Sequence, residues 1–323
     1  VEIGKAEIRD AGDVAAQAPG VSYVHFDLGQ LATQTPDAVH QMLAQVLEQM
    51  MAGRLQPLPK SVFDLEHAAD AFRHMAQRKH VGKIVLKPPE LCELRIDPEA
   101  TCLITGGLGE IGCAVARWLT ERGARHLALV GRHAPVADAA ALVAELRSKG
   151  VQVEVLSADV SDEQTLSASL AAIRQTLPPI RIVIHAAGIL RDRALGKLSW
   201  ADCMETVAAK AAGAWNLLQL LKAEPIERFV LFSSMASLFA PPGQAAYAMA
   251  NELLDSLAES GRPHLLSVAW GPWKEMGMGA RGGAAKAERY GVRALKASDA
   301  LDQLGALMAT PREGRIAVLQ LDL

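Results

Sequence analysis

Four polar residues in this sequence have types and spacings that suit the reduction of a carbonyl group. Ser234 lies thirteen positions before Tyr247, and Lys210 lies thirty-seven positions before it. A tyrosine hydroxyl has a pKa of about 10, so a tyrosine that protonates a developing alkoxide needs a cation beside it, and Lys210 is the candidate. Ser234 is a candidate hydrogen-bond donor to the same oxygen. Asn251 follows Tyr247 by four residues, which predicts that both lie on one face of a helix.

A glycine-rich loop in the same chain predicts a dinucleotide cofactor. Gly107, Gly109 and Gly112 have the G-x-G-x-x-G spacing, after an apolar strand and before an amphipathic helix over 114–122. In this arrangement a pyrophosphate lies on the N-terminal end of the helix, where free N–H groups favour an anion. The spacing alone is weak evidence, but the strand–loop–helix context supports it. Each of the four polar residues alone would be a buried structural group, whereas the whole set beside this loop indicates catalysis.

The ends of the next two strands predict which dinucleotide binds. Arg132 follows the strand 127–131, at the point where an enzyme that uses NAD presents Asp or Glu to the ribose. A guanidinium suits the 2′-phosphate of NADPH, so we expect NADPH, with a solvated surface charge as the alternative interpretation of Arg132. Asp159 follows a strand over 151–156 and could bind the adenine amino group or cap the next helix.

The composition is that of a globular protein. Half of the 323 residues are hydrophobic and the net charge is −3, which leaves no basic surface for nucleic acid. The longest apolar runs are too short to span a membrane, and the sequence contains no signal-peptide pattern. The four cysteines lack metal-binding spacing, so we expect no metal, reduced thiols and a cytoplasmic location. The chain begins at Val1 without a start methionine, from which we expect a piece of a longer protein.

A proline-rich stretch at 89–98 predicts a linker between two parts of the chain. After it, candidate strands alternate with helices, which predicts an α/β fold with a doubly wound parallel sheet of Rossmann type. Before it, a partial α/β nucleotide-binding segment contains too few elements for a closed core. We expect its strands at 1–3, 22–28 and 83–86 and its helices at 36–51 and 65–75, and strands of the second part at 101–105, 127–131, 151–156, 180–184, 228–232, 264–270 and 315–319.

On these features, residues 99–323 resemble the catalytic ketoreductase domain of reducing polyketide synthases, a relative of short-chain dehydrogenases/reductases. The matching stretches are TGGLG at 105–109, HAAGIL at 185–190, GQAAYAMAN at 243–251 and AWGPW at 269–273. Ordinary short-chain reductases place a lysine four residues after the tyrosine. Here Asn251 holds that position, and in the ketoreductase family the lysine comes from an earlier helix, as Lys210 does.

The resemblance implies NADPH-dependent reduction of a β-ketoacyl thioester carried by an acyl carrier protein, among the other domains of a synthase. By that likeness, Ser234 and Tyr247 bind the carbonyl oxygen and Tyr247 protonates it. Lys210 stabilises the phenolate and orients the ribose, and Asn251 anchors the proton relay. The implied cofactor residues are Thr105, Gly107, Leu108, Gly109, Ile111, Arg132, Asp159, Val160, Ala186, Ala187, Gly188, Lys210, Tyr247 and Pro272, and the implied substrate residues are Asp192, Gln244 and Trp273.

The same resemblance implies the configuration of the product. In this family, D-series alcohols go with a Leu-Asp-Asp motif after the Ala-Ala-Gly turn, and L-series alcohols with a tryptophan eight residues before the tyrosine. This chain has Leu-Arg-Asp at 190–192, Phe239 at the tryptophan position, and Pro242, which fits the D-type pattern. Arg191 and Ala246 depart from the D-type pattern. We expect a 3R product, formed beneath a mobile lid over 274–290.

Residues 1–88 resemble the C-terminal part of the enoyl reductase that precedes the ketoreductase in fully reducing modules. The matching stretches are VEIGK at 1–5, FDL at 26–28, LQPLP at 55–59 and KHVGKIV at 79–85. The likeness implies that Lys5 and Asp27 correspond to residues implicated in protonating the enoyl product, although both could be surface charges after strands. The phosphate loop and substrate domain of an enoyl reductase are absent from this sequence, so a scaffold role is the better interpretation of residues 1–88.

Two other functions compete with reduction. A non-catalytic, reductase-like structural domain would not need the four polar residues and the glycine loop that residues 99–323 contain. A nucleotide-sugar epimerase or dehydratase on a similar fold would be expected to have a lysine four residues after the tyrosine, where this chain has Asn251.

Overall fold

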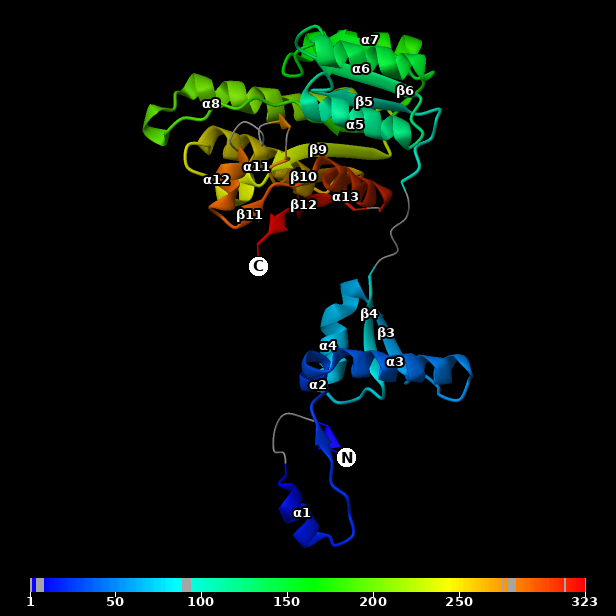
Figure 1. The fold of residues 1–323 in the computed structure, drawn as a ribbon. Coiled ribbons are helices and arrows are strands. Elements are labelled where there is room, and N and C mark those ends of the chain that lie inside the picture. Colours follow the sequence, from blue (N-terminus) through cyan, green and yellow to red (C-terminus); the bar gives the residue numbers. More distant parts are fainter. Residues whose placement is uncertain are drawn as a thin grey trace. The chain divides into compact units, whose positions relative to one another are not determined.

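The computed structural model describes residues 2–3, 9–88, 94–274, 276–277, 283–310 and 312–322. The chain divides into two compact units, Val1–Glu90 and Leu91–Leu323, which we call unit 1 and unit 2. Figure 1 shows the elements of both. None of the described helices is long and apolar enough to cross a lipid bilayer.

The centre of unit 2, within the described residues, is a seven-stranded parallel sheet, which we call the main sheet. Its order is β12-β10-β9-β8-β5-β6-β7, and each neighbouring pair is parallel. All seven predicted strands are present, and the doubly wound α/β prediction is confirmed. The strands are β5 (Thr101–Thr105), β6 (His126–Gly131), β7 (Gln152–Ser157), β8 (Ile180–His185), β9 (Arg228–Ser234), β10 (Leu265–Trp270) and β12 (Gly314–Val318).

Helices cover both faces of the main sheet because successive strand residues point to opposite sides. Ile104 of β5 packs in one hydrophobic cluster with Leu119 and Leu142, while the adjacent Leu103 packs in a second cluster with Leu166 and Leu254. The described helices of unit 2 are α5 (Glu110–Glu121), α6 (Ala137–Ser148), α7 (Glu163–Thr176), α8 (Trp200–Val207), α9 (Gly213–Leu220), α10 (Ala236–Phe239), α11 (Ala245–Glu259), α12 (Ala284–Glu288) and α13 (Ala297–Ala309), with short turns η2 (Leu195–Lys197) and the π-helical η3 (Ala208–Ala212).

The topology places one sheet edge where a ligand can bind. After β7 the chain crosses to β8, which pairs with β5 on its other side, so the strand order reverses between β5 and β8. Thr105 and His185 end these two strands and are register partners. Ligands of open α/β sheets bind beyond the carboxyl ends of strands at such a reversal. Two short strands, β11 (Val292–Arg293) and β13 (Gln320–Leu321), form a separate antiparallel pair.

Unit 1 contains short parallel strand pairs and helices. The predicted helix 36–51 is α3 (Pro36–Met51), and the predicted helix 65–75 is the turn η1 (Leu65–His67) followed by α4 (Ala68–Ala76). The predicted strand 22–28 is wrong at both ends, because only His25–Phe26 form a strand and a helix begins after Asp27. Asp27 accepts hydrogen bonds from the N–H groups of Gly29 and Gln30 and begins that helix. The remaining elements are β1 (Glu2–Ile3), β2 (His25–Phe26), β3 (Lys60–Asp64), β4 (Lys83–Lys87), α1 (Ala11–Gln17) and α2 (Leu28–Gln34).

Burial differs sharply between the units. Ala71 is the single buried residue among those described in unit 1, where Leu43 and Phe72 are 59% and 61% exposed. Unit 2 contains both hydrophobic clusters described above. Ile96, within the stretch predicted as a linker, is 5% exposed and packs in the core of unit 2.

Candidate active site

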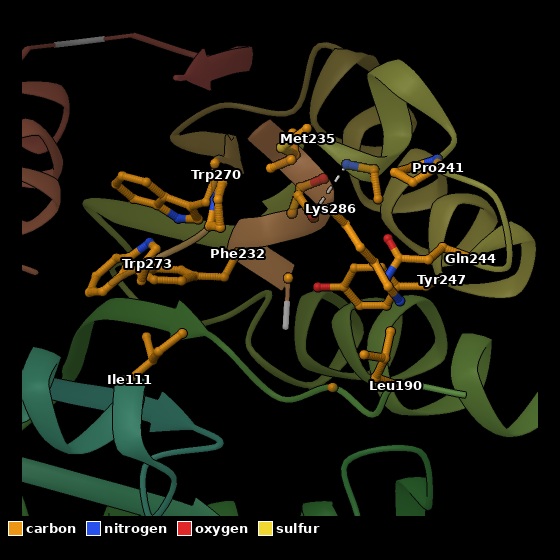
Figure 2. Close-up of a pocket in the computed structure, with 18 of the residues that line it drawn as sticks. Ile111, Leu190, Phe232, Met235, Pro241, Gln244, Tyr247, Trp270, Trp273 and Lys286 are labelled. Carbon is orange, nitrogen blue, oxygen red and sulfur yellow. Dashed lines mark hydrogen bonds between the residues drawn. The ribbon is translucent and has the colours of Figure 1, made fainter. Parts of the chain in front are cut away.

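Three of the four predicted catalytic residues line one cavity at the carboxyl end of the main sheet. Ser234 ends β9, Tyr247 lies in the first turns of α11, and Lys210 lies in η3. The cavity has about 1030 Å³ of empty space, part of it open to solvent. Figure 2 shows the Tyr247 hydroxyl directed into this space. Asn251 lies one turn behind Tyr247 on the same helix and is completely buried.

Lys210 is a buried cation held next to the tyrosine ring. Its Nζ donates to the carbonyl oxygen of Phe232 at 2.7 Å and lies 5.5 Å from the centre of the Tyr247 ring. Burial lowers the pKa of Lys210 to about 8, and the negative charge of Asp255 acts in the opposite direction. The π-helical turn that contains Lys210 is a rare local geometry that is frequent at functional sites.

His185 fixes the backbone of that turn. Its Nε2 lies 2.9 Å from the carbonyl oxygen of Lys210, which can only accept, so Nε2 bears the proton. The other ring nitrogen, Nδ1, then accepts from the Thr105 hydroxyl at 2.7 Å. Burial lowers the pKa of His185 to about 4, which keeps the ring neutral. His185 therefore has a structural, hydrogen-bonding role between β5 and the turn that contains Lys210.

Tyr247 retains its proton at neutral pH. Burial raises its pKa to about 12, while interactions with the side chains of Ser234 and Asn251 lower it. The Ser234 hydroxyl also accepts from the N–H of Ala236 at 3.2 Å, which orients it at the end of β9. Asn251 Nδ2 donates to the carbonyl oxygen of Tyr247 at 2.7 Å, and its buried Oδ1 has no hydrogen-bond partner among the described residues. A buried acceptor of this kind can receive a hydrogen bond from a bound water.

The walls of the cavity differ in chemistry. Trp270, Trp273 and Phe232 form an aromatic wall, with ring centres 5.4 Å apart for the two tryptophans and 5.5 Å apart for Phe232 and Trp270. Gln244 and Lys286 lie on the opposite side with Tyr247 (Figure 2). An apolar wall facing a few polar groups suits a largely apolar ligand with one polar group to be oriented.

Asp192, predicted as a substrate residue, lies at this polar wall. Its carboxylate accepts from Gln244 Nε2 at 3.2 Å and from Lys286 Nζ of α12. Its neighbour Arg191 makes a bidentate ion pair with Glu205, at 3.0 and 2.9 Å. Arg191, which departs from the Leu-Asp-Asp pattern, is therefore paired with Glu205. Asp192 lines the cavity.

A second cavity, of about 970 Å³, adjoins the first and contains most of the predicted cofactor residues. It is lined by Leu108, Gly109, Arg132, Asp159, Val160, Ala186, Ala187 and Gly188. Ala186 and Gly188 line both cavities, so the two spaces meet at this turn. Ile111 and Pro272 line the first cavity, together with Lys210 and Tyr247. Thr105 and Gly107 lie behind this surface, where Thr105 bonds His185 and a side chain on Gly107 would meet Ile104.

The glycine loop has the close backbone packing that a dinucleotide site needs. A Cβ on Gly112 would lie 2.2 Å from the carbonyl oxygen of Gly106, so no larger residue fits at this position. Gly106 has a φ of +68°, and a Cβ there would lie 2.8 Å from the backbone of Ala186. The left-handed turn is therefore made by Gly106, which the G-x-G-x-x-G spacing did not include. Gly109 lies at the N-cap of α5, lines the second cavity and leaves the first N–H groups of that helix without a side-chain cap.

Arg132 and Asp159 lie together in the second cavity. Burial raises the pKa of Asp159, but hydrogen bonds from the Ser161 hydroxyl and N–H, at 2.7 and 2.9 Å, outweigh it, and with Arg132 they hold the pKa below its usual value. The residue that caps α7 is Asp162, whose side chain accepts from the N–H of Gln164. The capping role considered for Asp159 is therefore filled by Asp162.

Comparison with known protein families identifies the family of this chain. The family model described as "KR domain" matches residues 100–275, more than half of the chain. The chain belongs to the KR domain family. KR domains of polyketide synthases are NAD(P)-dependent oxidoreductases, ketoreductases. This membership does not favour the two alternatives, a structural reductase-like domain and a nucleotide-sugar epimerase.

The relatives of this KR domain are large synthases. The chain is 38% identical, over 99% of its length, to the phenolphthiocerol synthesis polyketide synthase type I Pks15/1 of Mycobacterium marinum. It is 39% identical, over its whole length, to the pikromycin polyketide synthase component PikAII of Streptomyces venezuelae. The chain spans only 15% and 8% of these two proteins. The solved structure of PlmKR1, a ketoreductase from the first module of phoslactomycin biosynthesis in Streptomyces sp. HK803, is similar with a TM-score of 0.66 and 32% identity, covering 72% of this chain and 55% of that one.

Unit 1 matches a different family. A model described as "Zinc-binding dehydrogenase" matches residues 1–86, in agreement with the enoyl-reductase resemblance. No group of three or more His, Cys, Asp or Glu side chains in the described part of the chain could hold a metal ion. Of the two predicted residues of the remnant, Lys5 lies outside the described residues, and Asp27 caps α2.

The predicted lid is described only in part beside the KR site. Within the predicted lid over 274–290, residues 275 and 278–282 lie outside the described residues. Met276, Gly283 and Lys286 line the catalytic cavity. Lys286 was not among the predicted site residues, because its partner Asp192 lies 94 positions away and no local pattern connects them.

Proposed function

We propose that residues 99–323 are a catalytic ketoreductase domain that reduces a β-ketoacyl thioester on an acyl carrier protein to the β-hydroxyacyl thioester, with NADPH. Residues 1–88 are then the C-terminal fragment of an enoyl reductase without its own chemistry, joined by 89–98. The observation that supports this best is the meeting of the two cavities at Ala186 and Gly188. A cofactor along the second cavity would reach the first, where Lys210, Ser234 and Tyr247 lie.

The geometry suits Tyr247 as proton donor. NADPH, when bound, supplies the hydride that reduces the β-carbon. Tyr247 is neutral at physiological pH, so its hydroxyl can give a proton to the developing alkoxide, and Ser234 donates a hydrogen bond to the same oxygen. The ammonium of Lys210 then stabilises the phenolate that remains. The unpartnered Oδ1 of Asn251 can hold a water that returns the proton.

The preference for NADPH rests on Arg132. Its exposed guanidinium lines the second cavity beside Asp159. A guanidinium binds the three oxygens of a 2′-phosphate with charge-assisted hydrogen bonds, whereas NADH offers neutral hydroxyls there. The adenine amino group is the proposed partner of Asp159.

The 3R configuration rests on Asp192. Asp192 faces the cavity and is held by Gln244 and Lys286, while Phe239, at the tryptophan position of the L series, is 40% exposed beside Tyr290. We assign Asp192, Gln244 and Trp273 to the walls along which the acyl arm enters. The acyl carrier protein and the cytoplasmic location remain predictions of the same proposal.

One assay tests the function and the configuration together. The chain is supplied with NADPH and a β-ketoacyl-N-acetylcysteamine thioester, the absorbance of NADPH is followed, and the product is resolved by chiral chromatography. Oxidation of NADPH with a 3R alcohol supports the proposal. A 3S alcohol would overturn the configuration alone, and the absence of any reduction would overturn the function.

A further inference from the structure

Asp255 is a buried carboxylate on the catalytic helix that the mechanism above does not use. It lies eight residues after Tyr247 and four after Asn251, so the three share one face of α11. Its side chain is completely buried. A carboxylate inside a protein is unfavourable unless other groups compensate its charge and satisfy its oxygens. The contacts of Asp255 therefore show what it holds in place.

Three elements around α11 supply those contacts. The Ser267 hydroxyl of β10 donates to Oδ1 at 2.6 Å, and the Ser237 hydroxyl of α10 donates to Oδ2 at 2.6 Å. Arg315 of β12 places its Nη1 3.8 Å from Oδ2. The same guanidinium contacts the exposed Glu252 and Glu259 of α11, at 2.9 and 3.0 Å. Asp255 thus connects the catalytic helix to two strands and to the short helix that follows Ser234.

The connection to Ser234 runs through the turn that contains both serines. The Ser237 hydroxyl donates its single proton to Asp255 and also lies 2.9 Å from the carbonyl oxygen of Ser234. Ala236, within the same turn, donates its N–H to the Ser234 hydroxyl. The turn that orients the Ser234 hydroxyl is therefore held against α11, which bears Tyr247, through the pair Ser237 and Asp255. Two groups that must bind one carbonyl oxygen need their separation fixed in this way.

Asp255 also bears on the charge of Lys210. Lys210 is 3% exposed, and its burial favours the neutral amine. The charge of Asp255 raises the pKa of Lys210 and so favours the ammonium. Lys210 also lies next to two titratable groups, His185 on β8, which is neutral, and Tyr247 on α11. Asp255 lies next to Arg315 on β12, which in turn contacts Glu252 and Glu259 on α11.

We propose that Asp255 is a positioning residue of the reductase, which fixes the Ser234–Ser237 turn against α11 and whose negative charge favours the ammonium form of Lys210. The proposal rests on the function proposed above. The two proposed roles can be tested separately. Ser237→Ala breaks the connection to the Ser234 turn and keeps the negative charge of Asp255, whereas Asp255→Asn removes that charge.

The test compares kcat as a function of pH for the parent chain, Asp255→Asn, Ser237→Ala and the matched control Glu259→Gln. Glu259 lies one turn after Asp255 on α11, contacts the same Arg315 and is 47% exposed in its side chain, so its exchange removes the same charge outside the core. We expect Asp255→Asn to lower kcat roughly tenfold to a hundredfold, and to move the alkaline fall in kcat down by about one pH unit. Ser237→Ala should lower kcat roughly threefold to tenfold with no movement of that fall. Glu259→Gln should change neither.

Two outcomes would overturn the proposal: an alkaline fall that does not move in Asp255→Asn, or a kcat of Ser237→Ala equal to that of the parent. If Asp255→Asn yields no folded protein, the kcat of Ser237→Ala decides alone. The ¹⁵Nζ NMR signal of Lys210, assigned with Lys210→Met, follows the same titration without a substrate. A parent chain that reduces no thioester would overturn the proposed function, and this NMR titration would still decide whether Asp255 sets the charge of Lys210.

Discussion

Strand β5 of unit 2 and strand β4 of unit 1 have the same length and similar apolar sequences, yet only β5 is buried. Every residue of β5 is buried, whereas β4 alternates between exposed and half-buried residues. Both are paired in parallel with a neighbour. The difference lies in what covers them, since β5 has a strand on each side and packs against both hydrophobic clusters. Local sequence is enough to form a strand, and burial needs the rest of a sheet.

The same contrast separates the chemistry of the two units. In unit 2 the main sheet brings Lys210, Ser234 and Tyr247 from three different elements to one cavity. In unit 1 Asp27, the predicted functional residue that the structure describes, is used to cap a helix. A site built from distant residues requires a closed core to hold it, and on this comparison we expect the catalysis of the chain to reside in unit 2.

The largest expected effect is on stability, where one leucine is truncated in each unit. Leu129→Ala, at a fully buried position of β6, should lower the free energy of unfolding by about 2 to 5 kcal/mol, because it leaves a cavity. Leu47→Ala, at a position 59% exposed in α3, should change it by less than about 0.5 kcal/mol. Urea denaturation followed by tryptophan fluorescence reports unit 2, which contains all five tryptophans, and circular dichroism reports the whole chain. An equal loss of unfolding free energy in Leu129→Ala and Leu47→Ala would show that unit 1 has a core of its own.

A comparable effect is expected on turnover when a tyrosine hydroxyl is removed. Tyr247→Phe should lower kcat for a β-ketothioester by roughly a hundredfold or more, the size of a general-acid contribution, with folding and NADPH binding unchanged. Tyr23→Phe makes the same exchange in unit 1 and should leave kcat at the parent value. Rates are measured from NADPH absorbance. A Tyr247→Phe variant with parent activity would remove Tyr247 from the mechanism.

How far sequence alone predicts each unit follows from the same contrast. The strands of the main sheet were all predicted, because strands covered on both faces are continuous apolar runs. In unit 1, β3 was missed and Asp27 was assigned to a strand, because the half-exposed elements there lack a strong periodic pattern. The helix Pro36–Met51 was predicted correctly, since Pro36 marks its first turn.

In the site, residue type and spacing indicated candidate catalytic residues, three of which line one cavity, but not the contacts that hold them. The close approach of the Gly106 backbone to Ala186, eighty positions away, is one such contact. The π-helical turn at Lys210 and the ion pair between Lys286 and Asp192 likewise depend on tertiary neighbours. Sequence motifs indicate the groups that meet a ligand, whereas the groups that orient them become visible only in three dimensions.

The next effect concerns the cofactor preference of unit 2. Arg132→Ala should raise the KM for NADPH by roughly tenfold to a hundredfold, since a charge-assisted pair with a phosphate contributes about 1.5 to 3 kcal/mol. The KM for NADH is the internal control and should barely change. Steady-state kinetics with both cofactors measure the two constants. Equal changes for NADPH and NADH would mean that Arg132 contributes to structure only.

The number of cofactor sites sharpens the comparison further. We expect one NADPH per chain and no reduction of a crotonyl thioester, because residues 1–88 have no phosphate-binding glycine loop in their sequence. Gly112→Ala should remove that one site, since its Cβ would lie 2.2 Å from the Gly106 carbonyl oxygen. Fluorescence titration with NADPH counts the sites. Binding that persists in Gly112→Ala, or enoyl reduction by the parent, would place a second site in unit 1.

The smallest effect is expected from the largest change, removal of unit 1. A chain of residues 94–323 should keep kcat within about twofold and the Tm of unit 2 within about 2 °C, because its hydrophobic clusters are formed by its own residues. The start at 94 matters. Ile96 is 5% exposed and its N–H bonds the carbonyl oxygen of Arg122.

A chain that starts at 99 loses Ile96 and is the matched control for that truncation. Losing a buried isoleucine costs about 2 to 5 kcal/mol, so residues 99–323 should melt several degrees below residues 94–323. Calorimetry of the two truncated chains and the parent gives the three Tm values. If residues 94–323 lose stability or turnover as residues 99–323 do, unit 2 depends on unit 1, and the contrast between a self-sufficient unit and a dependent one fails.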